Sequence, residues 1–147
     1  MAVRGERARR LIDELLRLVG DLVPEHVTVT ANRYSLQASR FDDLSRMSQE
    51  DLRRAEEEQR PLGGAMAETS LTFGTWIPFL PRQLAARLTV VDALESIQDV
   101  LTKVIGSAWP ESGFEVRAGV SAAEVRVWFE NAAGNTIPVG TISRAVV

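Results

Sequence analysis

Cysteine and histidine, which carry out much enzymatic chemistry, are scarce in this sequence. The chain has no cysteine and a single histidine, His26, which directly follows Glu25. An adjacent carboxylate and imidazole can act as a general acid–base pair. No motif accompanies this pair, and a zinc site would need carboxylates for most of its ligands, which is an uncommon set. We therefore interpret His26 as a surface residue at a helix–strand junction, and predict no catalytic residue, metal ligand or cofactor.

The carboxylates are numerous but do not form a recognisable site. Asp42 and Asp43 are adjacent, and residues 56–58 are three consecutive glutamates. Consecutive helical side chains point in different directions, so the triplet does not converge on one ion. The spacing also lacks the alternating oxygen ligands of a calcium loop. Neither a Gly-x-Ser-x-Gly elbow nor a P-loop is present. These clusters are typical of a solvated surface.

Large apolar side chains around two prolines are the strongest sequence signal for binding. Proline cannot extend a sheet ladder, so the segment 76–81 is expected to leave regular structure. Its bulky groups either fill the core, which is the simpler interpretation, or form an exposed patch for a partner, where aromatic residues concentrate binding energy. The candidate partner-binding residues here are Trp76, Ile77, Phe79 and Leu80.

A second candidate lies on a strand predicted at 124–130. Alternation places Trp128 with Arg126 and Glu130 on one face, opposite Val125, Val127 and Phe129. A tryptophan among charged side chains on a strand is expected to be covered by another helix or subunit. Trp128 and Arg126 therefore complete the predicted partner-binding set.

Apolar periodicity predicts two long amphipathic helices. One covers residues 6–23, and the other covers 89–108, after a short helix at 82–88. Thr89 and Asp92 have the spacing of a capping box, which would open the second long helix. Trp109-Pro110 should end it. A polar helix with a thin apolar stripe is expected near 49–60, at the periphery of the fold.

Alternating patterns predict antiparallel hairpins. Strands are expected at 26–31, 34–39, 70–77, 114–118, 124–130 and 136–142, with a hairpin loop at Asn131–Asn135. The expected fold is α+β: an antiparallel sheet of β-hairpins packed on one face by two amphipathic helices, as a two-layer sandwich. Each long helix is followed by Pro-Glu and a hairpin. This pattern indicates either a degenerate helix–hairpin duplication or the coincidence of two common arrangements.

Length and composition favour one domain, residues 1–147. The chain is 45% hydrophobic and 25% charged, which is ordinary for a globular protein. It has no uncharged apolar run of about 20 residues, so no membrane span is expected. The net charge of −3 disfavours nucleic acid as a partner, although arginines cluster near the start. The absence of cysteine fits a reducing compartment, and because neither a signal-peptide pattern nor a membrane span is recognised, we expect a cytoplasmic location.

The function expected from these features is protein interaction without catalysis. The protein would be a homo-oligomer or an accessory component of a larger bacterial or phage assembly. One alternative is an immunity-type inhibitor of a basic toxin, on the strength of the glutamates at 56–58. Another is a carboxylate-based enzyme or a small-molecule binding module, either of which would require a pocket.

Overall fold

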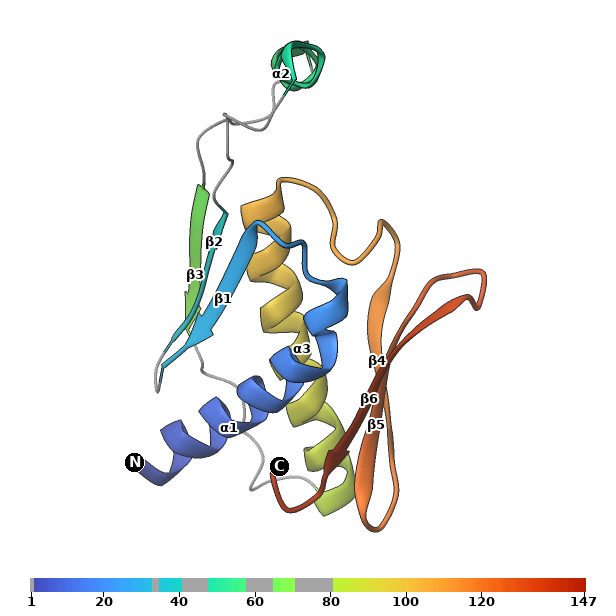
Figure 1. Ribbon diagram of the computed structural model, residues 1–147. Coiled ribbons are helices and arrows are strands. Elements are labelled where there is room, and N and C mark those ends of the chain that lie inside the picture. The colour runs from blue at the N-terminus through green and yellow to red at the C-terminus, as the bar shows by residue number, and fades with distance from the viewer. Residues whose placement is uncertain (1, 33–34, 41–47, 58–64, 71–80) are drawn as a thin grey trace.

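Two long helices form the middle of the protein, and a set of antiparallel strands follows each of them along the chain (Figure 1). The computed structural model describes residues 2–32, 35–40, 48–57, 65–70 and 81–147. The first half contains α1 (Ala2–Val19), a 3-10 turn η1 (Gly20–Leu22), β1 (Val27–Ala31), β2 (Ser35–Arg40), α2 (Gln49–Glu57) and β3 (Ala65–Ser70). The second half contains α3 (Arg82–Ile105), β4 (Glu115–Val120), β5 (Glu124–Glu130) and β6 (Thr136–Ser143).

Helix α1 forms where apolar residues recur at three- and four-residue steps. This spacing places them on one face. The residues of that face that are completely buried are Leu11, Ile12, Leu15 and Val19. The helix tightens into η1, and the chain then turns at Pro24, whose carbonyl accepts a hydrogen bond from the Val27 amide at 3.0 Å. The periodicity therefore located this helix correctly.

Helix α3 is one continuous helix, so the predicted start at Thr89 is wrong. Pro81 stands at its N-cap. Thr89 lies inside the helix, where its buried hydroxyl donates to the Ala85 carbonyl at 2.7 Å instead of capping an end. The helix ends at Gly106, which adopts φ 84° and donates its amide to the Thr102 carbonyl. None of the helices in the described ranges has both the length and the apolar character needed to cross a membrane.

The strands form two three-stranded antiparallel sheets, one on each side of α3, which confirms the α+β class. The first sheet has the order β1-β2-β3 and the second the order β4-β5-β6. The hairpins therefore do not join into the single sheet expected from the sequence. The reason lies in α3, whose apolar surface is wide enough to contact β2 and β3 on one side and β4 and β5 on the other (Figure 1).

Each half contains one long helix and three strands, but α2 stands between the second and third strands of the first half only, so the duplication stays a hypothesis. Each helix packs against its own half and the other: α1 contacts β1 and β6, whereas α3 contacts β4 and β3.

At the α1–β6 contact, Gly140 has φ 146°, and a Cβ there would lie 2.8 Å from Cδ2 of Leu18. Glycine is thus required where β6 meets α1. Helix α2 lies within the first half and stands apart from the other elements (Figure 1).

Strand β3 differs most from the expectation. The alternating stretch at 70–77 suggested a strand, but β3 occupies Ala65–Ser70, and residues 71–80 lie outside the described part of the chain. The sequence Ala-Met-Ala-Glu-Thr-Ser has little intrinsic strand preference. Its position is fixed by pairing with β2 from Arg40↔Ala65 to Ser35↔Ser70.

Two polar contacts join the halves inside the core. Arg40 of β2 is 7% exposed, and its Nη1 donates to the carbonyls of Val104 and Ile105 at 3.0 and 3.1 Å. A cation at a helix C-terminus is favoured by the helix dipole. The second contact is donated by the second half: Nε1 of the buried Trp109 donates to the Leu22 carbonyl of the first half at 2.9 Å.

The Arg40 contact can be tested by substitution. Arg40→Leu should lower the free energy of unfolding by about 2–3 kcal/mol, because it removes charge-assisted hydrogen bonds and leaves the carbonyls at the end of α3 buried without their donor. Urea denaturation followed by circular dichroism measures the change. The matched control is Arg54→Leu on α2, where an exposed 3.9 Å pair with Glu50 should contribute less than about 0.5 kcal/mol. Equal losses in the two variants would contradict the assignment.

Candidate functional site

The outward face of the second sheet presents the most distinctive group of side chains. Val125, Val127 and Phe129 are buried toward the helices, so the intervening residues of β5 point away from them. The register aligns Trp128 with Arg117 of β4 and Pro138 of β6. One step along the strands, Arg126 is aligned with Gly119 and Thr141. We call these six residues the Trp128 face.

Trp128 is held in place by three contacts. The Arg126 guanidinium carbon lies 4.9 Å from the centroid of its ring, a cation–π arrangement. Indole Nε1 donates to Oε1 of Glu130 at 3.4 Å. The ring also extends over β4, because a Cβ built on Gly119 would lie 3.7 Å from its outer carbons. Trp128 is therefore partly buried against its own sheet, with Arg126 and Glu130 as polar neighbours.

The carboxylates at one end of this surface already have partners. Glu115 accepts a hydrogen bond from Nη2 of Arg117 at 3.0 Å, and Nη1 of the same guanidinium donates to the Val116 carbonyl. Glu130 accepts from the indole of Trp128. Arg126 differs from Arg117 in its partner. Within the described residues, Arg126 contacts the Trp128 ring, whereas Arg117 pairs with a carboxylate.

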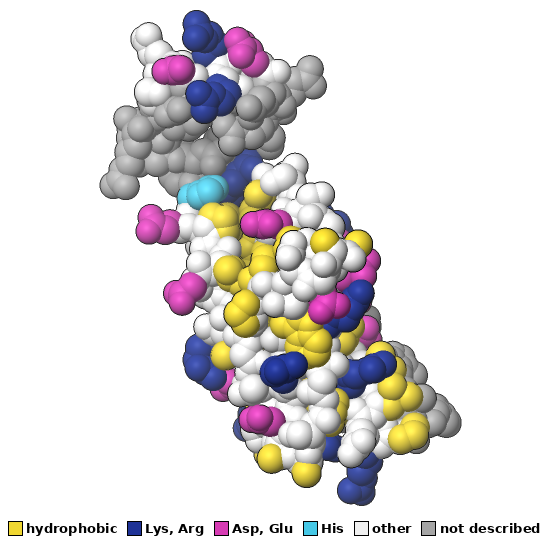
Figure 2. Space-filling model, turned by 90° about the vertical axis from the view of Figure 1, so that its right-hand side faces the viewer, with side chains coloured by type: hydrophobic (Ala, Val, Ile, Leu, Met, Phe, Trp, Pro, Cys, Tyr) yellow, Lys and Arg dark blue, Asp and Glu magenta, His cyan; other side chains and the backbone are white. Residues whose placement is uncertain are grey.

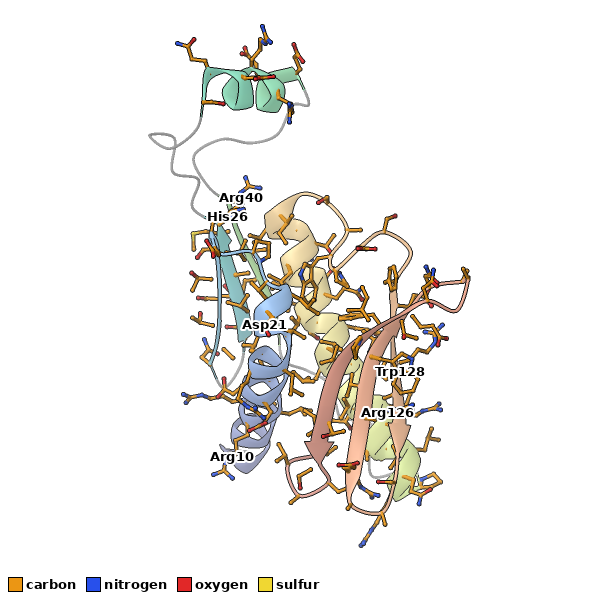
Figure 3. The ribbon with its side chains drawn as sticks, turned by 45° about the vertical axis from the view of Figure 1, so that its right-hand side comes forward. Arg10, Asp21, His26, Arg40, Arg126 and Trp128 are labelled. Carbon is orange, nitrogen blue, oxygen red and sulfur yellow. The ribbon has the colours of Figure 1, made fainter. Side chains whose placement is uncertain are left out.

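Seen from the side of β4–β6, hydrophobic side chains run down the middle of the protein and charged side chains border them (Figure 2). Figure 3 shows Arg126 and Trp128 together on β5, pointing away from α3. The helices pack against the opposite, inner side of this sheet. The expected helical cover over Trp128 is thus not found within the described ranges.

Two of the six predicted partner-binding residues can be located. Arg126 and Trp128 share one outward face, as strand alternation predicted. The other four residues, Trp76, Ile77, Phe79 and Leu80, lie outside the described residues. Gly119, Pro138 and Thr141 were missed, because only the pairing of the three strands brings them beside β5.

The remaining sequence candidates lie on separate parts of the protein (Figure 3). Glu25 and His26 are exposed at the turn before β1, and no hydrogen bond or ion pair between them is found in the described structure. Near the start of the chain, Arg9 is paired with Asp13 at 3.7 Å and Arg17 with Glu14 at 2.6 Å. Internal pairing of these arginines reduces the charge that they offer to phosphates.

An open groove of about 520 Å³ lies between α3 and β4. Its lining residues are Glu95, Gln98, Asp99, Thr102, Glu115, Val116 and Arg117. Partial burial, followed by the charges of Asp92 and Glu115, raises the pKa of Glu95 above its ordinary value, and burial likewise raises the pKa of Asp92. Among the described residues, no group of three or more His, Asp or Glu is placed to hold a metal ion.

The sequence contained only part of the signal for this groove. Asp92, Glu95 and Asp99 recur at three- and four-residue spacing, which places them on one side of α3. Glu115 is distant in sequence and reaches the groove only because β4 packs against α3.

No protein-family profile, curated protein or solved structure showed a significant match to this chain.

The raised carboxyl pKa values predict a specific pH dependence of stability. A carboxyl whose pKa is higher in the folded than in the unfolded protein destabilises the fold when ionised, and this penalty disappears as the pH falls through the folded pKa toward the unfolded one. Glu95→Gln should therefore be more stable than the wild type at neutral pH, by less than about 1 kcal/mol because the site is largely solvated. The difference should shrink as the pH approaches the ordinary glutamate pKa of 4.5.

Thermal unfolding across this pH range provides the measurement. Glu25→Gln, at an exposed position on the turn before β1, controls for the general effect of removing one negative charge. If Glu95→Gln and Glu25→Gln change stability equally at every pH, the effect does not come from the burial of Glu95 and its neighbouring charges in the groove.

Proposed function

We propose that the protein is a non-catalytic interaction module that binds a partner protein through the Trp128 face. The observation that carries the proposal is the cation–π pair formed by Trp128 and Arg126 on a sheet surface that the described helices leave open. Tryptophan and arginine are enriched among the residues that dominate binding energy at protein interfaces.

The packing of the pair supports this function. Trp128 is already fixed by Gly119, Arg126 and Glu130, so it would lose little conformational entropy on binding. Pro138 and Thr141 extend the surface across β6. An exposed, partly apolar sheet surface with oriented polar groups suits the surface of another protein better than a small substrate, which needs a concave site.

The groove gives less support to an enzyme. Glu95, Asp99 and Glu115 are exposed in an open site, so the water exclusion that strengthens acid–base chemistry is absent there. Thr102 Oγ1 accepts a hydrogen bond from the Trp109 amide at 3.2 Å and thereby helps to hold the chain after α3.

The Trp128 face can be tested with the tagged protein in its source cell. A partner should co-purify with the wild type in a fixed ratio and be lost with Trp128→Ala, because the variant removes the central apolar contact. Native mass before and after substitution distinguishes a second copy of the chain from another protein. The control is Met66→Ala on the first sheet, where the side chain is 83% exposed. Retention of the partner by a folded Trp128→Ala variant would contradict the proposal.

The groove favours a second candidate, an immunity-type inhibitor of a basic toxin. Mutual repulsion around Glu95 would be relieved by a cationic side chain inserted beside Glu115. Glu95→Lys should then weaken capture of a basic partner at least about tenfold and reduce its salt sensitivity, whereas Trp128→Ala should not. Binding to a panel of small basic proteins, measured by calorimetry at two salt concentrations, provides the test. Equal weakening by both variants would count against the groove.

A further inference from the structure

We infer that the segment bound at the Trp128 face carries a carboxylate, which Arg126 receives above the ring of Trp128. The inference rests on the proposed function and adds the chemistry of the partner. It follows from the charges on this face, from the fixed position of Arg126 and from the space beside it.

Arg126 is the positive charge that this face leaves available. The guanidinium of Arg117 is shared between Glu115 and the Val116 carbonyl, and Glu130 is engaged by the Trp128 indole. Within the described part of the chain, Arg126 interacts with the ring and with no carboxylate. A cation in this position complements a negative group on the partner.

The ring prepares Arg126 for that contact. A guanidinium stacked on an aromatic ring keeps its N–H groups in its own plane, where they remain available for a two-pronged contact with a carboxylate. The cation–π contact at 4.9 Å also restricts the side chain before the partner arrives. Less rotamer entropy is then lost when the ion pair forms.

The neighbours of Arg126 leave room for the incoming group. On one side the register places Gly119, over which the Trp128 ring lies, so the approach to Arg126 is from the side of β6. On the other side lies the exposed Thr141, whose hydroxyl can donate a further hydrogen bond to the same carboxylate.

The next row along the strands specifies a second feature of the partner. Trp128 and Pro138 are aligned there on neighbouring strands, and Pro138 is exposed. Residues two apart on a strand are separated by about 7 Å. An extended segment with Asp or Glu two residues from a large apolar side chain would therefore contact Arg126 and Trp128 together.

Nucleic acid fits this face less well, although phosphate also pairs with arginine. A polyanion would lie across Glu115, Glu124 and Glu130, which surround the two arginines, and the whole chain carries a net charge of −3. A single carboxylate meets Arg126 without covering those side chains.

Selection from a random peptide library, displayed on phage and presented to the wild-type protein, tests the inference. The recovered peptides should be enriched in Asp or Glu two residues from Leu, Ile, Phe or Trp. Synthesised peptides should bind at least about tenfold more weakly to Arg126→Gln and with intermediate affinity to Arg126→Lys, which keeps the charge but loses the planar fork. Trp128→Ala should abolish binding, and Arg87→Gln, an exposed control on α3, should leave it unchanged.

Each other outcome has a defined meaning when the variants retain the wild-type melting transition. Neutral or basic peptides that require Trp128 but tolerate Arg126→Gln would overturn the carboxylate inference and leave the proposed function intact. If no recovered peptide depends on Trp128, the result counts against both the carboxylate inference and the proposed function. A single-stranded oligonucleotide could instead bind more tightly than the peptides and displace them. If its affinity is also reduced by Arg126→Gln, the face binds phosphate, and the carboxylate inference is overturned.

Discussion

The burial of α3 on two sides is the constraint on which the rest of this structure depends. A helix that is apolar over so much of its circumference cannot be covered by one sheet, because a sheet meets only one side of it. Ala86 and Val90 near its start and Leu101 and Val104 near its end are all buried. The two sheets and α1 provide the cover, and the strand faces that they leave outward become the surfaces available to other molecules.

The sequence predicted those elements whose pattern is local. Three- and four-residue spacing located α1, and strict alternation placed Trp128 and Arg126 on one side of β5. Prediction from the sequence failed where one local pattern is compatible with two different local structures. The spacing of Thr89 suits a helix cap, but the same hydroxyl satisfies an internal carbonyl when the helix begins earlier. Strand β3 depends on pairing with β2, which no property of its own residues reveals.

The two candidate surfaces differ in what determines them. The Trp128 face is a consequence of strand register, which brings Gly119 and Pro138 from neighbouring strands beside a tryptophan. The groove is a consequence of helix–strand packing, since Glu95 and Glu115 come together only where β4 lies against α3. Sequence reasoning reached part of the first because alternation is local, and could not reach the second because its members are distant along the chain.

The crossed packing of the helices has a consequence for how the chain gains and loses structure. Helix α1 covers a strand of the second half, and α3 covers strands of the first, so neither half alone contains a complete hydrophobic core. Separating the halves would expose both sheets and would also break the Trp109–Leu22 contact. Each half therefore relies on the other for part of the cover over its apolar surface, although both contain one long helix and three strands.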